Sequence, residues 1–321
     1  MNGSNFKAAG VNLFTRCPSN PIITTHNLHY PANSIFNAGA AMLDGWTYLV
    51  ARVEDMRGLS HLTVLKSKDG ISNWITDEKP VFLPDPEHCP EEMWGIEDPR
   101  ITWLEDLKAF GIVYTAYSRR GPQVSLALTK DFKTFERKGV ILPPEDKNAS
   151  LFPVKFNDNW AVLHRPVAVG QDSNIWLSFS TDLKRWGDHA MVLECRRGAW
   201  WDSHRIGACP PPMRTDKGWL ILYHGVRNTV SGAIYRLGLA LLDIDDPTKV
   251  LKRSDEWIFG PAEPYELIGD VHNVVFPCGW ILDEETGRIR LYYGAADTSI
   301  ALATGELAEI LDYLEHCPAP K

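Results

Sequence analysis

The segment MWGIEDPRITW (93–103) places two carboxyl groups and a guanidinium around a proline, a combination that could support acid catalysis. These groups belong to Glu97, Asp98 and Arg100. Enclosure by an aromatic side chain such as Trp94 would raise the pKa of a carboxyl group and suit it to act as a general acid near neutral pH. A neighbouring guanidinium would lower that pKa, so both outcomes remain open, and an Asp-Pro pair can also simply form a turn.

Other polar side chains recur at two positions of an internal repeat. At the start of its first strand are Ser34, Asn37, Glu97, Asp98, Ser150, His272 and Asn273, and near the end of its second are Arg52, Tyr117, His164, Arg165, His224 and Asp297. Residues of these types can also cap turns or extend to solvent. Their recurrence at the same positions of the repeat nevertheless favours one shared cavity.

The repeat has three parts, each an expected strand. The first covers 34–43, 96–104, 149–156, 206–213 and 273–282; the second covers 44–52, 107–117, 157–165, 216–225 and 286–294. The third covers 62–74, 124–135, 175–186, 235–247 and 299–307. Its first three copies carry a Ser/Thr-x-Asp turn before an aromatic residue. We interpret Asp69, Asp131 and Asp182 as structural, because a turn carboxylate accepts backbone N–H groups.

Five copies with a period of about 50 to 65 residues predict an all-β fold, a five-bladed β-propeller. Helical spacing of apolar residues occurs only near the C-terminus and predicts a short helix over about 305–317. No linker or low-complexity stretch divides the chain. We therefore expect residues 1–321 to form one domain, in which equivalent positions of all blades converge on a central cavity.

Composition excludes several classes of function. The formal charge is 33 − 41 = −8, which argues against nucleic-acid binding and against acidic membrane surfaces. Six cysteines without metal-like spacing are expected to be reduced thiols, and we expect no metal site. No apolar run reaches the ~18 residues of a membrane span, and the N-terminus lacks a secretory pattern, so we expect a cytoplasmic protein.

Several longer motifs carry a family resemblance: IFNAG, GIEDPRIT, LHRP, YHGV, YRLGLALLDIDDPTKV, VVFPCG and YYGAADT. With these in the same order from about residue 20 to residue 311, the chain resembles glycoside hydrolase family 130, the β-mannoside phosphorylases and related β-mannosidases. The family fold is a five-bladed β-propeller, in agreement with the count of repeats.

The resemblance implies inverting cleavage of a β-mannosidic bond, usually with inorganic phosphate as the attacking group and α-mannose 1-phosphate as a product. It makes Asp98 the general acid, whose proton travels through a hydroxyl of the bound mannose. Phosphate is then a co-substrate, and no cofactor is expected. Homo-oligomers are common in the family, so a homo-oligomer is possible here.

The resemblance also assigns binding residues. Arg165, Arg205 and His224 lie where family phosphorylases carry phosphate-binding cations, with His204 as a further candidate. Arg165 is the foremost of these, because a guanidinium can bind phosphate through two parallel hydrogen bonds. A salt bridge with Asp202 is the structural alternative for Arg205. One departure is Val154, since some phosphorylases have an arginine after the Leu-Phe-Pro motif.

For the mannosyl ring, the resemblance assigns Asn37 and Asp297 as hydroxyl partners, and Arg52, Asn273 and Tyr117 are further candidates. Two alternatives to a phosphorylase remain open. One is an inverting β-mannosidase, for which Glu194, Asp202 and Glu263 are conceivable bases that would deprotonate water. The other is a glycan-binding propeller without catalytic activity.

Overall fold

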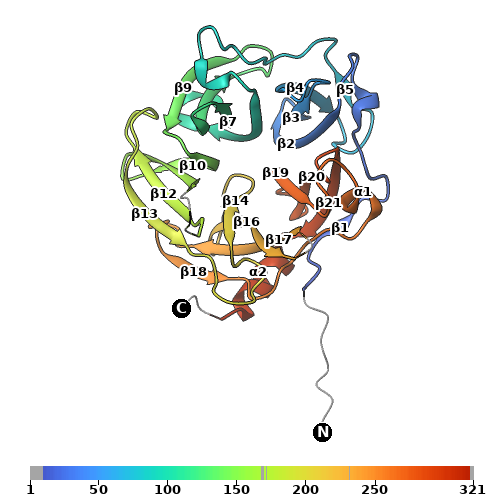
Figure 1. Cartoon of the computed structure of the whole chain (residues 1–321). Helices are drawn as coiled ribbons and strands as arrows, with labels where there is room; N and C mark the ends of the chain where they lie inside the picture. Colours follow the sequence, from blue (N-terminus) through green and yellow to red (C-terminus); the bar gives the residue numbers. More distant parts are fainter. Residues whose placement is uncertain (1–9, 168–169, 171, 231, 319–321) are drawn as a thin grey trace.

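Five sheets are arranged like blades around a central axis (Figure 1). The structure, a computed structural model, describes residues 10–167, 170, 172–230 and 232–318. Strands make up 53% of these described residues and helices 8%. The all-β, five-bladed propeller predicted from the repeat is confirmed.

Each blade is an antiparallel sheet that runs outward from the axis. Blade 1 contains β2 (Ser34–Leu43), β3 (Trp46–Glu54), β4 (Ser60–Ser67) and β5 (Ile75–Thr76). Blade 2 contains β6 (Ile96–Leu104), β7 (Ala109–Ser118), β8 (Gly121–Thr129) and β9 (Glu136–Leu142). Blade 3 contains β10 (Asp146–Phe156), β11 (Asn159–Pro166), β12 (Ile175–Ser180) and β13 (Gly187–Leu193).

The last two blades differ slightly from this plan. Blade 4 contains β14 (Arg205–Ala208), β16 (Gly218–Thr229), β17 (Gly232–Leu242) and β18 (Val250–Arg253), with β15 (Met213–Thr215) paired to β16. Blade 5 contains β19 (Val275–Asp283), β20 (Arg288–Ala295), β21 (Ser299–Glu306) and the N-terminal strand β1 (Thr15–Arg16). Short helical turns are η1 (Thr25–Asn27), η2 (Pro90–Glu92), η3 (Glu105–Leu107) and α1 (Pro264–Leu267).

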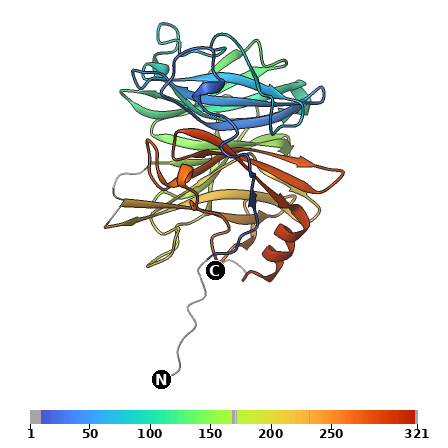
Figure 2. The same cartoon turned by 90° about the vertical axis from the view of Figure 1, so that its right-hand side faces the viewer.

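The ring is closed by β1, which comes from the start of the chain and pairs with β21 from its end. The register pairs Thr15 with Thr304 and Arg16 with Ala303. A closed ring leaves fewer unpaired strand edges, because the first and last blades need not remain separate. The expected C-terminal helix is α2 (Leu307–His316), and Figure 2 shows it at the periphery, on the same side as β1. Its Ile310, Leu311 and Leu314 are buried.

The Ser/Thr-x-Asp turns are structural, as predicted. Asp69 Oδ1 accepts hydrogen bonds from the backbone N–H groups of Ile71 and Ser72, both at 2.8 Å. Asp131 and Asp182 bind the equivalent N–H groups of their own turns. These hydrogen bonds lower the pKa of all three carboxyl groups, so the turns are held by ionised side chains on the outer part of blades 1 to 3.

Apolar side chains fill the spaces between neighbouring blades. The largest cluster joins blades 4 and 5 to α2, and others lie between blades 3 and 4, 1 and 2, 5 and 1, and 2 and 3. The rigid core therefore fixes the inner strands relative to one another. All six cysteines are free thiols. Within the described residues, no helix is long and apolar enough to cross a membrane.

Candidate active site

A repeated backbone irregularity directs polar side chains toward the axis. In blades 1, 2 and 3 the innermost strand contains a bulge in which two residues oppose one on the next strand. The first bulged residue is Asn37, Asp98 or Asn148, with φ of 47°, 50° and 56°. Asn and Asp tolerate this left-handed conformation better than most residues, because their short polar side chains can hydrogen-bond locally.

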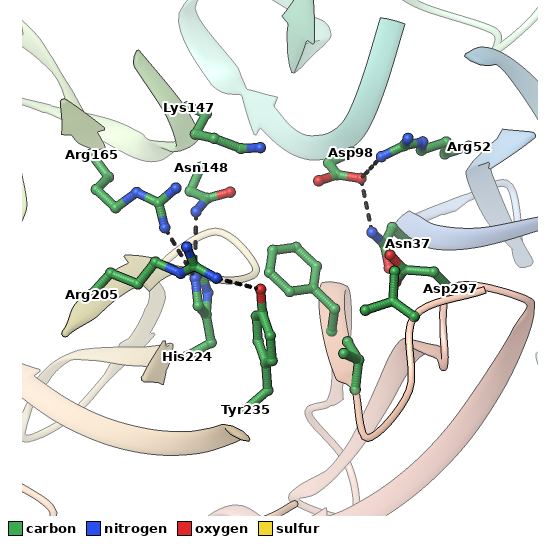
Figure 3. A pocket seen from close by; sticks show the side chains of 13 residues that line it. Asn37, Arg52, Asp98, Lys147, Asn148, Arg165, Arg205, His224, Tyr235 and Asp297 are labelled. Atoms are coloured by element: carbon green, nitrogen blue, oxygen red, sulfur yellow. Dashed lines mark hydrogen bonds and ion pairs between the residues drawn. The ribbon is translucent and has the colours of Figure 1, made fainter. Parts of the chain in front are cut away.

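The bulges contribute to a central cavity of about 280 Å³. Ten of the side chains that line it are polar or charged: Asn37, Arg52, Asp98, Lys147, Asn148, Arg165, Arg205, His224, Tyr235 and Asp297. The other three are apolar: Val271, Val274 and Phe276. Figure 3 shows Asp98, Arg52, Asn37 and Asp297 together on one side, and Lys147, Asn148, Arg165, Arg205, His224 and Tyr235 on the other. The cavity thus has a carboxylate side and a cationic side.

On the carboxylate side, Asp98 is buried and held by two donors. Its Oδ1 accepts hydrogen bonds from Asn37 Nδ2 at 2.8 Å and from Arg52 Nη1 at 3.3 Å. Burial raises the pKa of the Asp98 carboxyl, but the charges of Arg52 and Arg100 outweigh burial and hold this pKa below its ordinary value. Asp98 is therefore ionised in the free protein at neutral pH.

The enclosure of this carboxyl group by Trp94, one of the two effects left open by the sequence, is not found. Trp94 is 41% exposed, lies edge-on to Tyr117 and does not line the cavity. Arg100 is 1% exposed and donates to the backbone oxygens of Cys209 and Asp98, each at 2.8 Å. The opposing effect, lowering of the pKa by guanidinium groups, is the one that dominates.

Asp297 is the second carboxyl group in the cavity and has the opposite electrostatic character. Burial, followed by the negative charge of Asp98, raises the pKa of Asp297 to about 7. The positive charge of Arg52 opposes this shift only in part. Near neutral pH, a fraction of Asp297 is therefore protonated and can donate a hydrogen bond to a sugar hydroxyl as well as accept one.

We expect the substitution Asp297→Asn to flatten the dependence of stability on pH. Folding raises the pKa of this carboxyl from 3.8 to about 7, so its stabilising contribution is full below the unfolded-state value. That contribution is lost as the pH rises through 7, and the neutral amide has no such loss. Thermal unfolding midpoints measured between about pH 4 and 8 test this. Parallel curves for wild type and variant would contradict the assignment.

On the cationic side, three side chains carry charge without a carboxylate partner. Lys147, Arg165 and Arg205 form no ion pair with any residue that the structure describes. Arg205 Nη2 donates to the hydroxyl of Tyr235 at 2.9 Å and does not pair with Asp202, the structural alternative considered from the sequence. Asp202 instead binds Arg196 and Arg253. This side of the cavity is therefore positively charged.

The cations repel one another. Burial, and next the charge of Arg205, lower the pKa of Arg165 to about 10, and burial lowers the pKa of Lys147 as well. Both shifts mean that the folded protein holds these charges at a cost, although Arg165 remains charged near pH 7. An anion bound between them would relieve that cost.

His224 is buried beneath the two arginines. Its Nε2 lies 3.4 Å from Arg165 Nη1 and 3.5 Å from Asn148 Nδ2. Burial and the charge of Arg165 hold the pKa of His224 well below its ordinary value, so the ring is neutral in the free protein. The assignment of His224 as a phosphate-binding residue stays a prediction, and a neutral imidazole can form a hydrogen bond to phosphate.

Seven of the ten residues assigned from the sequence line this cavity. They are Asp98, Arg165, Arg205, His224, Asn37, Arg52 and Asp297. His204, Asn273 and Tyr117 do not. His204 precedes Arg205 in the chain and is exposed, as expected when neighbouring extended residues point in opposite directions. Asn273 is an exposed loop residue with φ 60°, and Tyr117 is 38% exposed at the end of β7.

Sequence reasoning missed Lys147, Asn148 and Tyr235. It aligned Ser150 with Asn37 and Asp98, but Asn148 occupies the equivalent bulge, while Ser150 is buried and donates to Cys209 O at 3.0 Å. The sequence contains a signal for the correct alignment: Asn37 and Asn148 both precede an alanine, and Asp98 precedes a proline. Lys147 immediately precedes its bulge, as Glu97 does in blade 2.

The bases considered for hydrolysis lie elsewhere. Glu194, Asp202 and Glu263 do not line the cavity, and Asp202 is fully buried in its ion pairs. Lys155, next to the Val154 departure, pairs with Asp106 of η3 at 2.6 Å and does not line the cavity. Among the described residues, no group of three or more His, Cys, Asp or Glu side chains has an arrangement that could hold a metal ion.

Comparison with known proteins gives consistent similarities. The family described as beta-1,4-mannooligosaccharide phosphorylase, glycoside hydrolase family 130, matches residues 18–316. A beta-1,4-mannooligosaccharide phosphorylase of Ruminococcus albus is 37% identical over 94% of this chain and 90% of its own. A beta-1,2-mannobiose phosphorylase of Listeria innocua is 40% identical over 86% of this chain and 72% of its own.

A solved structure agrees with these sequence comparisons. The beta-1,2-mannobiose phosphorylase from Listeria innocua, in complex with beta-1,2-mannobiose, superposes with a TM-score of 0.84 and 33% identity. The match covers 94% of this chain and 99% of the other. The similarity therefore extends over the whole ring, including every blade that contributes to the cavity.

Proposed function

The chain belongs to glycoside hydrolase family 130, and from that premise we propose that it is an inverting β-mannoside phosphorylase. In this reaction inorganic phosphate cleaves a β-mannoside or short β-manno-oligosaccharide to α-mannose 1-phosphate and a shortened acceptor. Relatives named for both β-1,4 and β-1,2 linkages support the class of substrate and leave the linkage open.

The observation that carries the proposal is a set of cations, without carboxylate partners among the described residues, that face Asp98 across the cavity. An inverting hydrolase needs a second carboxylate, roughly 6.5–9.5 Å from the acid, to deprotonate water. That side of the cavity instead contains Lys147, Arg165 and Arg205. Phosphate is already an anionic nucleophile near neutral pH, so it needs cations to hold it and no base to activate it.

The site supports a reaction whose protons balance. The bond between mannosyl C1 and the leaving oxygen breaks as a phosphate oxygen bonds to C1 from the opposite face. The leaving oxygen receives a proton from Asp98, through a sugar hydroxyl in the manner of the family. Hydrogen phosphate carries one proton and the dianionic product none, so phosphate returns to Asp98 the proton that the acceptor takes.

Phosphate also accounts for how an ionised Asp98 can become an acid. Lys147 and Arg100 both lower the pKa of Asp98 in the free protein. A dianion bound at Lys147 neutralises part of this positive field and adds negative charge, and both effects raise the pKa of Asp98. In this proposal Asp98 is therefore protonated, and able to act as an acid, only when phosphate is bound.

The direct test is incubation with β-1,4- and β-1,2-mannobiose with and without phosphate. We expect mannose 1-phosphate as the product, with release of the acceptor that depends on phosphate. The NMR signals of the anomeric proton and the phosphorus of mannose 1-phosphate should identify the α-anomer at the first time points, as inversion requires. Equal release of free mannose without phosphate, and no mannose 1-phosphate, would show that the protein is a hydrolase.

Two further features belong to the proposal. We propose that the enzyme acts in the cytoplasm, which six free thiols support because reducing compartments preserve them. We propose that it needs no cofactor beyond phosphate as co-substrate. Activity that is lost to a chelator and restored by a divalent ion would contradict this.

A further inference from the structure

A second cavity, of about 500 Å³, lies apart from the central one between blades 2 and 3. We call it the side cavity. The end of β9, the segment 143–145 that leads into β10, and the faces of β11, β12 and β13 form its walls. Its volume is within the range of small-molecule sites. The catalytic proposal uses none of its residues.

One wall contains a continuous chain of hydrogen bonds. Asp146 Oδ2 lies 2.6 Å from His164 Nδ1, and His164 Nε2 lies 2.7 Å from Ser178 Oγ. Ser178 Oγ lies 2.6 Å from Nδ1 of His189, which is exposed. Asp146, His164 and Ser178 are all buried. The polar groups of this wall are thus fixed before any ligand arrives.

The direction of these hydrogen bonds defines what the wall offers. An ionised carboxylate only accepts hydrogen bonds, so His164 donates from Nδ1 to Asp146. Nε2 of a neutral His164 then accepts a hydrogen bond from the hydroxyl of Ser178. Ser178 can then accept from His189 Nδ1, which leaves Nε2 of His189 as a free acceptor on an exposed ring. Such a ring presents an acceptor to a hydroxyl donor.

The walls of the side cavity combine aromatic surface with polar atoms that have no hydrogen-bond partner among the described residues. Trp176 and Trp186 both line the side cavity, together with three prolines. Trp186 Nε1 and Asp146 Oδ1 are buried and have no hydrogen-bond partner within the described part of the chain. Buried polar atoms rarely lack partners, so one donor and one acceptor remain to be satisfied in these walls.

The charge of the side cavity is opposite to that of the catalytic one. Its lining includes three carboxylates, Glu145, Asp146 and Asp172, and neither lysine nor arginine among the described residues. An anion such as phosphate would be repelled. A neutral ring with several hydroxyl groups suits the site, since its C–H face can pack on indole and its hydroxyls can both donate and accept.

We propose that the side cavity is a second carbohydrate-binding site that holds one neutral hexopyranose ring. That this ring belongs to a manno-oligosaccharide rests on the proposed function, whereas the chemistry of the walls does not. Asp146 and His164 directly precede Lys147 and Arg165, so the same two strands, β10 and β11, contribute to both cavities. An oligosaccharide held here is kept near the catalytic centre at raised local concentration.

The test follows the indole N–H signals of Trp176 and Trp186 by NMR in the full-length protein, in phosphate-free buffer. β-1,4-Mannotriose and β-1,2-mannotriose are titrated separately, and the signals are assigned with Trp→Phe variants. We expect at least one trisaccharide to shift both signals in a saturable manner. Trp176→Ala should weaken the binding reported by Trp186 about tenfold, and His189→Ala should weaken it as well.

Trp46→Ala is the matched control, because Trp46 is also a half-buried tryptophan but lies on blade 1, and it should leave the titration unchanged. Absence of any shift with both trisaccharides, or a shift caused only by a diamine such as putrescine, would overturn the proposal. Saturable shifts in a protein that shows no phosphorolysis would support the side cavity while contradicting the proposed function, so the two failures are distinguishable.

Discussion

Asp98→Asn should lower kcat for phosphorolysis of a mannobiose by about a hundredfold to ten-thousandfold, the usual contribution of a general acid. The amide has the size of the carboxyl group and its oxygen can still accept the 2.8 Å hydrogen bond from Asn37. It has no proton of suitable acidity to give to the leaving oxygen. Initial rates at saturating phosphate measure the effect, and KM for phosphate should change much less.

A second substrate separates loss of the acid from damage to the site. 4-Nitrophenyl β-mannoside has a leaving group that departs without protonation. The Asp98→Asn variant should therefore keep a much larger fraction of the wild-type rate with this substrate than with mannobiose. Glu97→Gln is the matched control, because Glu97 also pairs with Arg52 at 3.3 Å but does not line the cavity. Equal losses in the two variants would mean that the charge balance of Arg52, and not an acid, had been removed.

Much of the fold could be predicted because a propeller repeats one local pattern. The alternation of apolar residues and the Asp69-type turns identify three strands of each blade. The fourth, outermost strand was not predicted. It has only two residues in β5 and four in β18, too few for a periodic signal, and in the seven-residue strands β9 and β13 the apolar residues do not alternate with polar ones. The closing strand β1 is as short as β5, and its partner β21 lies at the other end of the chain.

The site could be predicted only in part, because its electrostatics depend on blades that are distant in sequence. Asp98 was recognisable from its motif, but the sign of its pKa shift depends on Arg52 from blade 1. Asn148 was missed because its strand begins three residues earlier than expected, at Asp146. The lowered pKa of His224 follows from burial and then from the nearby charge of Arg165, and no linear spacing reveals either.

The unpaired state of Arg165 leads to an unusual prediction about stability. Arg165 and Arg253 are both buried, with 7% and 8% exposure. Within the part of the chain that the structure describes, Arg253 has a carboxylate partner, Asp202 at 2.8 Å, and Arg165 has none. Folding lowers the pKa of Arg165 to about 10, so the folded state is less favourable for its charge than the unfolded state is. Removing that charge should therefore not destabilise the free protein, whereas breaking the Arg253 pair should.

We expect Arg165→Met to unfold at or above the temperature of the wild type in phosphate-free buffer and to lose the stabilisation that phosphate gives the wild type. Arg253→Met should unfold at a clearly lower temperature, because loss of one partner of a buried pair costs about 3–5 kcal/mol. KM for phosphate should rise about tenfold to a hundredfold in Arg165→Met, as expected for a lost charged hydrogen bond. Thermal melts over a phosphate series, with initial rates, measure both effects.

The combination of results distinguishes a ligand-binding charge from a structural one. A structural arginine would give a lower melting temperature in the free protein and a phosphate response like that of the wild type. A phosphate ligand gives the reverse, because the repulsion between Arg165 and Arg205 is present only until the anion binds. If Arg165→Met keeps both its phosphate response and its KM, phosphate is held by Lys147 and Arg205 alone, and our assignment of Arg165 is wrong.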